Sequence, residues 1–225
     1  GELAQNKHDY GVAARTYQDG LEHFPHDADM HFGLAQAFAP SDDRQAAQAL
    51  AKALEFNPNH VSAILFAADQ LIDSERYDEA AKSLEYALTV DPRNPESWAY
   101  RAVLAHLRGD LSIEQECRAE ALQSWKTNLA VDHLIGRKLS QKYRFAEGSA
   151  SQRQALTFDA CFLLAKIQLA QDLLRLGQEA EGWQHAEEVH QRDRYDVVAY
   201  NLVTLRDNIA KFRTVSDDAF IVRMD

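Results

Sequence analysis

Three stretches of the chain share one spacing of small, large and helix-ending residues. They are residues 10–25, 43–58 and 77–92. Each has an alanine, a large residue four positions later, a small residue three positions after that, and a proline after five more. In the middle stretch these anchors are Ala46, Leu50, Ala53 and Pro58. Offsets of four and three lie on one face of an α-helix, and proline cannot continue a helix. The pattern therefore predicts a helix with one buried stripe in each stretch, ending near the proline.

The stretches recur with a period of 33 to 34 residues, as shown by the positions of Pro25, Pro58 and Pro92. This resembles the tetratricopeptide repeat, a 34-residue helix-turn-helix unit with small residues where its two helices cross. The next steps fall on Lys126, Ala160 and Arg194, so the proline is lost. The small positions persist, for example at Gly136 and Ala155. The resemblance implies an all-α, right-handed superhelical solenoid of about six repeats, the first lacking most of its leading helix, plus a final helix near residues 197–210.

The connections between the predicted helices are short. Residues 91–95, for example, are not rich in glycine or serine, so they are not a flexible linker. We therefore expect one solenoid over residues 1–210. Residues 211–225 break the period, and residues 220–224 are apolar and branched, as in a strand. We expect an extended tail here, the start of a further domain, whose strand either pairs with residues beyond this chain or packs alone.

Composition indicates a folded, soluble protein. Apolar residues make up 46% of the chain and charged residues 26%, which is too apolar for a disordered chain and too mixed for a membrane span. With 24 basic and 35 acidic side chains, the net charge of −11 repels phosphate and disfavours nucleic acid as a partner. No membrane insertion is expected. A cytoplasmic location is the default, and Gly1 as a trimmed start leaves export open.

Motifs for catalysis or metal binding are missing from the sequence. The nearest pattern places His185 and His190 five positions apart, whereas the HExxH zinc helix needs four so that both imidazoles face one metal. Cys117 and Cys161 fit neither a paired-cysteine metal site nor a disulfide framework. There is no P-loop, GxGxxG or GxSxG. We therefore expect a protein that is not an enzyme, with no catalytic residues, no metal and no cofactor.

The resemblance also implies a binding surface. In tetratricopeptide repeat proteins, the first helix of each unit lines a concave groove. Transferred to this chain, the register predicts a peptide-binding groove lined by Leu65, Phe66, Asp69, Tyr100, Val103, His106, His133, Arg137, Gln171 and Asn201. The same register adds Leu174 and Leu205. This mixture of apolar and hydrogen-bonding groups suits a peptide or a partner helix.

Several of these side chains have a second interpretation. Phe66 and Tyr100 fit core contacts between stacked helices equally well, and Arg137 fits an exposed or self-paired charge. Basic residues are scarce among the inward positions, which disfavours a clamp for a C-terminal carboxylate. The tryptophans are expected in the core or between units; they are Trp98, Trp125 and Trp183.

The second half of the chain carries a further resemblance. Residues 131–148, 166–183, 196–207 and 212–224 are similar to the repeat region that precedes a zinc metallopeptidase-like domain in large bacterial repeat proteins. That family's HExxH domain would lie beyond Asp225, so no catalytic role falls on these residues. The leading hypothesis is a protein-protein interaction scaffold, a fragment of a longer protein, that holds a peptide or partner segment. The alternative is a substrate-presenting or regulatory arm of such a hydrolase. Self-association through the terminal repeats is a third hypothesis, because the first unit lacks its leading helix.

Overall fold

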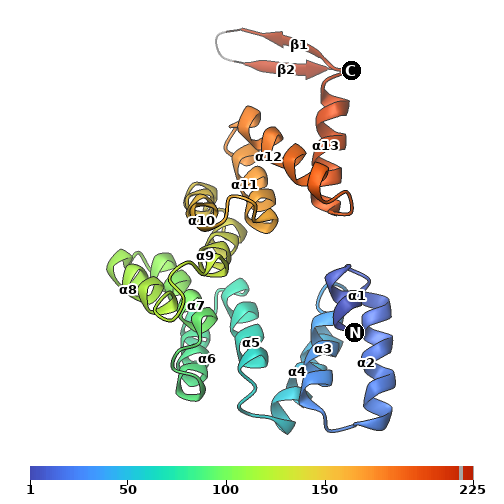
Figure 1. Ribbon diagram of the computed structural model, residues 1–225, viewed down its shortest axis with the longest axis vertical. Helices are drawn as coiled ribbons and strands as arrows, with labels where there is room; N and C mark the ends of the chain where they lie inside the picture. Colours follow the sequence, from blue (N-terminus) through green and yellow to red (C-terminus); the bar gives the residue numbers. More distant parts are fainter. Residues whose placement is uncertain (218–219, 225) are drawn as a thin grey trace. The chain divides into compact units, whose positions relative to one another are not determined.

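The chain folds into a series of helix hairpins followed by a short β-hairpin (Figure 1). The computed structural model describes residues 1–217 and 220–224. The first helices are α1 (Glu2–Asn6), α2 (Tyr10–His23), α3 (Ala28–Phe38), α4 (Asp43–Phe56), α5 (Val61–Asp73), α6 (Tyr77–Val90) and α7 (Pro95–Leu107). They are followed by α8 (Leu111–Ala121), α9 (Leu129–Gln141), α10 (Phe145–Phe158), α11 (Leu163–Arg175), α12 (Glu179–Arg192) and α13 (Val197–Ile209). We call the odd-numbered helices from α3 onward leading helices and the even-numbered ones trailing helices. The all-α repeat architecture predicted from the sequence is confirmed.

Small residues lie where the helices cross, and they keep the period in both halves of the chain. On the leading helices, Ala68, Ala102 and Ala170 are fully buried at intervals of 34 and 68 residues. On the trailing helices, Ala87 and Ala155 are fully buried as well. At the α9–α10 crossing, the leading position is Gly136, where an added Cβ would lie 2.8 Å from the carbonyl oxygen of Gly148. The period therefore continues through the half without prolines. It depends on the small residues at the helix crossings, and the crossings do not depend on proline.

The turns inside the repeats also keep the period. Positive φ angles occur at Glu75 (60°), Gly109 (80°), Tyr143 (61°) and Gly177 (76°), each 34 residues after the one before. Each of these residues lies between a leading helix and its trailing helix. Glycine adopts this left-handed conformation without steric cost, whereas other residues are strained there. The backbone geometry of the turn is thus maintained in all four repeats, although two of them have no glycine at this position.

Most leading helices begin with a side-chain cap. Asp27 accepts a hydrogen bond from the backbone N–H of Met30, and Asp196 accepts one from that of Ala199. At α5 the cap is a histidine, since Nδ1 of His60 accepts from the N–H of Ala63 at 3.2 Å. These bonds satisfy backbone donors that the first turn of a helix leaves unpaired.

The chain divides into two compact units, Gly1–Leu104 and Ala105–Asp225. In the first unit, small core residues on α3, α4 and α5 pack against the half-buried Phe32 and Phe66. In the second unit, one core cluster joins α11, α12 and α13 through Ile167, Val189 and Ala199. The single solenoid over residues 1–210 stays a prediction.

The second unit ends in a β-hairpin. Strand β1 (Arg213–Ser216) pairs antiparallel with β2 (Ile221–Met224), with Val215 opposite Val222. The strand character of residues 220–224 was expected, with pairing to residues beyond this chain or packing alone as the two alternatives. Instead, β2 pairs with β1, which precedes it in the same chain. Residues 218, 219 and 225 of the predicted tail lie outside the described residues.

Candidate functional site

In the first unit, most of the predicted groove residues lie in the core. Leu65 is 2% exposed, Tyr100 3% and Val103 0%. The Tyr100 hydroxyl on α7 donates a hydrogen bond to Oδ1 of Asp69 on α5 at 2.9 Å. Neighbouring leading helices therefore approach closely enough to cover the side chains between them. The structure places Leu65, Tyr100 and Val103 as core contacts, so they leave almost no surface for a ligand.

Two of the predicted residues of the first unit keep part of their surface. Phe66 and Asp69 are half-buried. The ring of Phe66 packs edge-on against Phe32, with ring centres 5.9 Å apart. Phe66 is therefore partly a core contact, which was the second interpretation of its position.

The two predicted histidines of the second unit are held by neighbouring side chains. Nδ1 of His106 lies 2.9 Å from Oε2 of Glu114, and the histidine is only 9% exposed. Nδ1 of His133 lies 2.9 Å from Oε1 of Gln152, which can only accept. His133 must therefore donate from Nδ1, and burial lowers its pKa. Both imidazoles are oriented by the fold.

A buried polar network lies behind the predicted groove, between α9 and α11. Oγ of Ser140 is 2.7 Å from Oδ2 of Asp172 and 2.8 Å from the carbonyl oxygen of Gly136. Nε2 of Gln168 donates to Oδ1 of Asp172 at 3.0 Å. Asp172 is fully buried, and this desolvation raises its pKa. The single hydroxyl proton of Ser140 cannot be donated to both the Gly136 carbonyl oxygen and the Asp172 carboxylate. If Asp172 is protonated, its carboxyl O–H can donate to Ser140 Oγ while Ser140 donates to Gly136. The network joins consecutive leading helices and is structural.

Of the remaining predicted residues of the second unit, Gln171 lines an open hollow, whereas Arg137 on α9 does not. Arg137 and Gln171 are half-buried, and Asn201 is exposed. A hollow of about 340 Å³ lies between α11, α12 and α13; we call it the α11–α13 hollow. Its lining is Gln171, Leu174, Arg175, Glu179, Trp183, Leu202, Leu205 and Ile209. Asn201 is one turn before Leu205 on the same face of α13. The register thus located Gln171, Leu174 and Leu205 at this hollow.

The trailing helix contributes a wall of the hollow that the sequence pattern did not predict. Trp183 was expected in the core or between units; it is half-buried and lines the hollow together with Glu179. The signal was available, because α12 starts just after the tight turn at Gly177 and so returns beside the end of α11. The expectation for Trp125 was wrong: it follows α8, is 59% exposed, and its Nε1 donates to Thr127 Oγ1 at 3.0 Å. Trp98 is half-buried.

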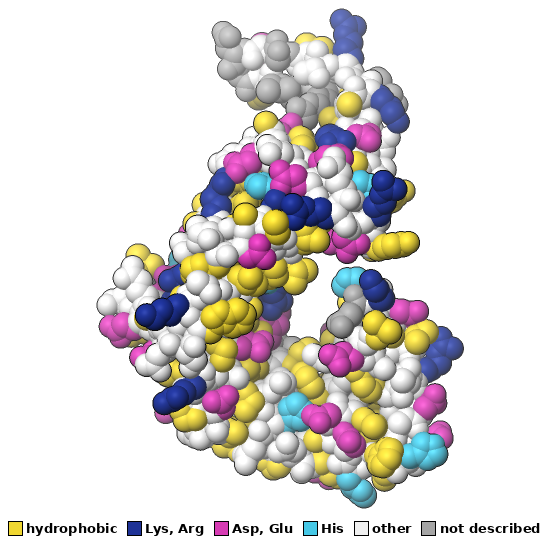
Figure 2. Space-filling model, viewed as in Figure 1, with side chains coloured by type: hydrophobic (Ala, Val, Ile, Leu, Met, Phe, Trp, Pro, Cys, Tyr) yellow, Lys and Arg dark blue, Asp and Glu magenta, His cyan; other side chains and the backbone are white. Residues whose placement is uncertain are grey.

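The charges around the hollow are mixed. Its lining includes one base, Arg175, and one acid, Glu179. The guanidinium of Arg175 lies 5.2 Å from the centre of the Phe145 ring. On the face drawn in Figure 2, acidic and basic side chains are interspersed over the surface. The hollow is therefore suited to an apolar side chain with hydrogen-bonding groups beside it.

The described residues show neither a cluster of metal-ligating side chains nor a helix able to cross a membrane. They contain no group of three or more His, Cys, Asp or Glu side chains placed to hold a metal ion. None of their helices combines the length and apolar character that crossing a bilayer requires.

Comparison with known proteins finds a repeat family that matches the first half of the chain. The family model for the tetratricopeptide repeat matches residues 1–61 and 65–112. No curated protein matches the chain. A tetratricopeptide repeat protein from Parabacteroides merdae is similar in structure, with a TM-score of 0.66 and 13% identity, over 92% of this chain and 81% of its own. Pseudomonas aeruginosa pilF gives a TM-score of 0.55 and 14% identity, over 90% of this chain and 92% of its own.

The APC/C hetero-tetramer Cut9-Hcn1 contains a longer similar chain. Its TM-score is 0.57 at 16% identity, and the match covers 88% of this chain but only 39% of that one. At such low identities the likeness shows the fold alone. The resemblance of the second half to a metallopeptidase-associated region stays a prediction.

Proposed function

We propose that this chain is a tetratricopeptide repeat scaffold, in which a peptide segment of a partner protein binds against the leading helices of the second unit. The observation that carries the proposal is the α11–α13 hollow. Its volume of about 340 Å³ lies in the range of small-ligand sites, and leucines and Trp183 line it. An apolar side chain of the peptide would fill it, and the Gln171 amide would bind the peptide backbone. No catalytic step is part of this proposal.

The structure of the hollow supports a preformed site. Leu205 is 48% exposed, so an apolar group is presented to solvent on α13. Covering such a group with a peptide side chain contributes about 25 cal/mol per Å² of apolar surface removed from water. The hollow lies between helices of one unit, so it requires no rearrangement to form.

The test is capture of a partner by the whole chain, followed by mass spectrometry, with two matched variants. Leu205→Glu places a charge in the hollow and should abolish capture. Leu164→Glu makes the same change at another exposed leucine, 55% exposed on α11 and outside the hollow lining, and should leave capture intact. Equal capture by both variants would refute the assigned site.

Trp183 provides a direct readout of occupancy. In a chain with Trp98 and Trp125 replaced by phenylalanine, emission comes from Trp183 alone. A peptide recovered by capture should shift this emission with a saturable dependence on concentration. An unchanged spectrum at saturating peptide would contradict binding in the hollow.

The same proposal includes two further statements about the whole protein. We infer that the chain is part of a longer protein, on the resemblance of residues 131–224 to the region that precedes a metallopeptidase-like domain. Sequencing the parent reading frame past residue 225 decides between the two hypotheses. An HExxH motif there would favour the hydrolase arm, and its absence would favour the scaffold. Self-association is tested by light scattering over a range of concentrations, where a constant monomer mass would exclude it.

A further inference from the structure

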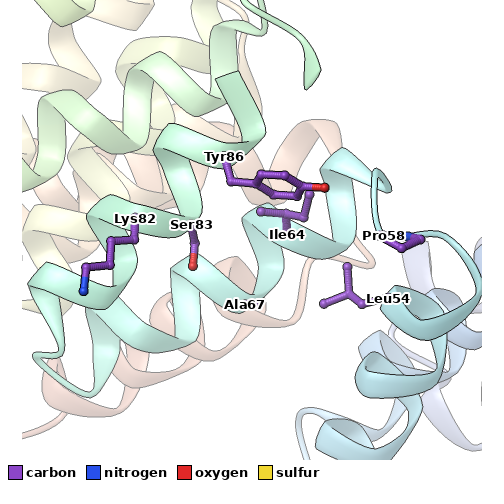
Figure 3. Close-up of a pocket in the computed structure, with 7 residues that line it drawn as sticks. All are labelled: Leu54, Pro58, Ile64, Ala67, Lys82, Ser83 and Tyr86. Carbon is purple, nitrogen blue, oxygen red and sulfur yellow. The ribbon is translucent and has the colours of Figure 1, made fainter. Parts of the chain in front are cut away.

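The first unit has a second kind of hollow, formed between its trailing helices. It lies between α4, α5 and α6 and has a volume of about 380 Å³; we call it the α4–α6 hollow (Figure 3). Its lining is Leu54, Pro58, Ile64, Ala67, Lys82, Ser83 and Tyr86. At about 30 Å³ per molecule, this is space for roughly twelve waters, enough for a leucine or phenylalanine side chain and adjoining backbone. None of these seven residues belongs to the predicted groove.

The hollow recurs one repeat earlier, so it follows from the repeat geometry. A space of about 530 Å³ lies between α2, α3 and α4, where His31, Leu34 and Ala49 are among the lining residues. These three stand 33 or 34 positions before Ile64, Ala67 and Ser83. The two hollows therefore use the same positions of consecutive repeats. They form because small or short side chains leave the space between neighbouring trailing helices unfilled.

The walls of the α4–α6 hollow are fixed by local bonds. The Tyr86 hydroxyl donates to Oδ1 of Asn59 at 2.7 Å, which ties α6 to the turn that carries Pro58. Ile64 is only 5% exposed and forms part of the floor. The Ser83 hydroxyl donates to the backbone oxygen of Glu79. Figure 3 shows the Tyr86 ring beside Ile64, with Ser83 and Lys82 further along α6. A rigid apolar site costs little ordering entropy when it is filled.

The charge of this hollow is opposite to the charge of the chain. The chain has a net charge of −11, yet the only charged residue in the lining is Lys82. Among the described residues, no salt bridge to Lys82 occurs. The nearby carboxylate of Glu79 is already bound by both Nε and Nη2 of Arg76. In the earlier hollow, by contrast, Lys52 pairs with Glu55 at 2.7 Å. Among the described residues, Lys82 therefore has a charge interaction with Glu79 but no salt bridge, so its ammonium group is less neutralised than that of Lys52.

We propose that the α4–α6 hollow is a second peptide-binding site, which takes an apolar side chain followed by an acidic residue from a partner protein. The apolar side chain packs on Ile64, Leu54 and the Tyr86 ring, and the carboxylate pairs with Lys82. This site is separate from the α11–α13 hollow and does not depend on binding there. It would let the trailing helices of the first unit select a partner by the sign of its charge.

The experiment is a methyl NMR titration of the full chain with two capped peptides. They are acetyl-Ser-Leu-Glu-Ser-amide and its counterpart with lysine in place of glutamate. The chain has seven isoleucines, so the Ile64 methyl signal is readily assigned by substitution. We expect a saturable shift of Ile64 with the glutamate peptide, with a dissociation constant on the order of millimolar, and about five-fold weaker binding of the lysine peptide. No shift of Ile64, or equal binding of both peptides, would overturn the proposal.

Four variants keep the result interpretable. Lys82→Glu should reverse the preference, whereas Lys126→Glu makes the same change in net charge on an exposed residue of the second unit and should preserve it. Ser83→Leu should fill the hollow and abolish the Ile64 shift. The signal of Ile72, which is fully buried, reports that each variant is folded. Leu205→Glu should still bind the glutamate peptide, so a failure of this site is distinguishable from a failure of the α11–α13 hollow. A preference unchanged in Lys82→Glu would refute the role of the ammonium group.

Discussion

A methyl group added at Gly136 should force α9 away from α10. The Cβ of alanine there would lie 2.8 Å from the carbonyl oxygen of Gly148, which is 0.6 Å closer than the 3.4 Å where ordinary contact begins. This oxygen belongs to the backbone of the facing helix and cannot rotate away. The same Cβ would lie 2.5 Å from Nε2 of Gln152, which donates to the His133 carbonyl oxygen. Gly136→Ala therefore overpacks the crossing and disturbs one buried hydrogen bond.

The size of the effect follows from three contributions. Overpacking a close contact costs about 1–3 kcal/mol, and losing a buried hydrogen bond costs about 1 kcal/mol. The higher helix propensity of alanine over glycine returns about 1 kcal/mol. The net loss of unfolding free energy should be about 1–3 kcal/mol, which for a chain of this size lowers the melting temperature by roughly 2–4 °C per kcal/mol.

Urea denaturation followed by far-UV circular dichroism measures the loss, and hydrogen exchange locates it. Amides of residues 129–158 should exchange faster in Gly136→Ala. The matched control is Gly11→Ala on α2, where the new Cβ would lie 4.0 Å from the flexible Arg15 side chain. This variant should gain up to about 1 kcal/mol from helix propensity. A Gly136→Ala chain as stable as the wild type would refute the close crossing of α9 and α10.

Three further tests address other features of the fold. Burial raises the folded-state pKa of Asp172 above its unfolded-state pKa, so the wild type loses stability as the pH rises from the unfolded-state pKa through the folded-state pKa. Asp172→Asn does not have this loss and should therefore gain stability relative to the wild type as the pH rises. Urea midpoints at pH 4 and pH 7 measure the stability difference between the two proteins, and a difference that is the same at both pH values would contradict the prediction. His60→Ala should lower the unfolding free energy by about 1 kcal/mol because the cap of α5 is lost, whereas asparagine in His60→Asn can cap the helix and should retain most of this stability. Thermal melts compare the two variants, and equal losses of stability would show that the His60 cap does not stabilise the fold. Gly177→Ala should destabilise the fold by about 1 kcal/mol, because alanine is strained at the φ of 76° found there. Tyr143→Gly should stabilise the fold by up to about 1 kcal/mol, because glycine relieves the strain at a φ of 61°. Urea titrations measure both changes in unfolding free energy, and changes of the same sign would disprove strain in these turns.

The sequence predicts the helices and their period well, because the crossing residues are constrained by close packing at every repeat. Trailing helices α10 and α12 end at Phe158 and Arg192, two residues before the positions where proline is absent. The final helix was expected near residues 197–210 and is Val197–Ile209. Helix ends are thus set by the repeat geometry, and proline only reinforces them.

Exposure of the groove residues was harder to predict. Register shows the direction in which a side chain points, but the neighbouring repeat decides whether that side chain is covered. Val103 and Gln171 belong to the same predicted surface, yet Val103 is fully buried and Gln171 lines a hollow. The Ser140–Asp172 pair was missed for a related reason, since a buried polar contact between two repeats leaves no periodic signal in one chain.

The bond between Ser140 and Asp172 limits how freely the repeats can be exchanged. The two side chains come from consecutive leading helices, 32 residues apart. A helix pair of generic sequence inserted between α10 and α11 would remove the Ser140 hydroxyl from Oδ2 of Asp172 and leave that buried oxygen unpaired, at a cost of about 1–3 kcal/mol. A junction formed by buried alanines alone would in principle be modular. The α9–α11 junction depends on specific side chains, as does the α5–α7 junction with its Tyr100–Asp69 bond, so natural duplication or engineered lengthening of the array should be least tolerated at these two places.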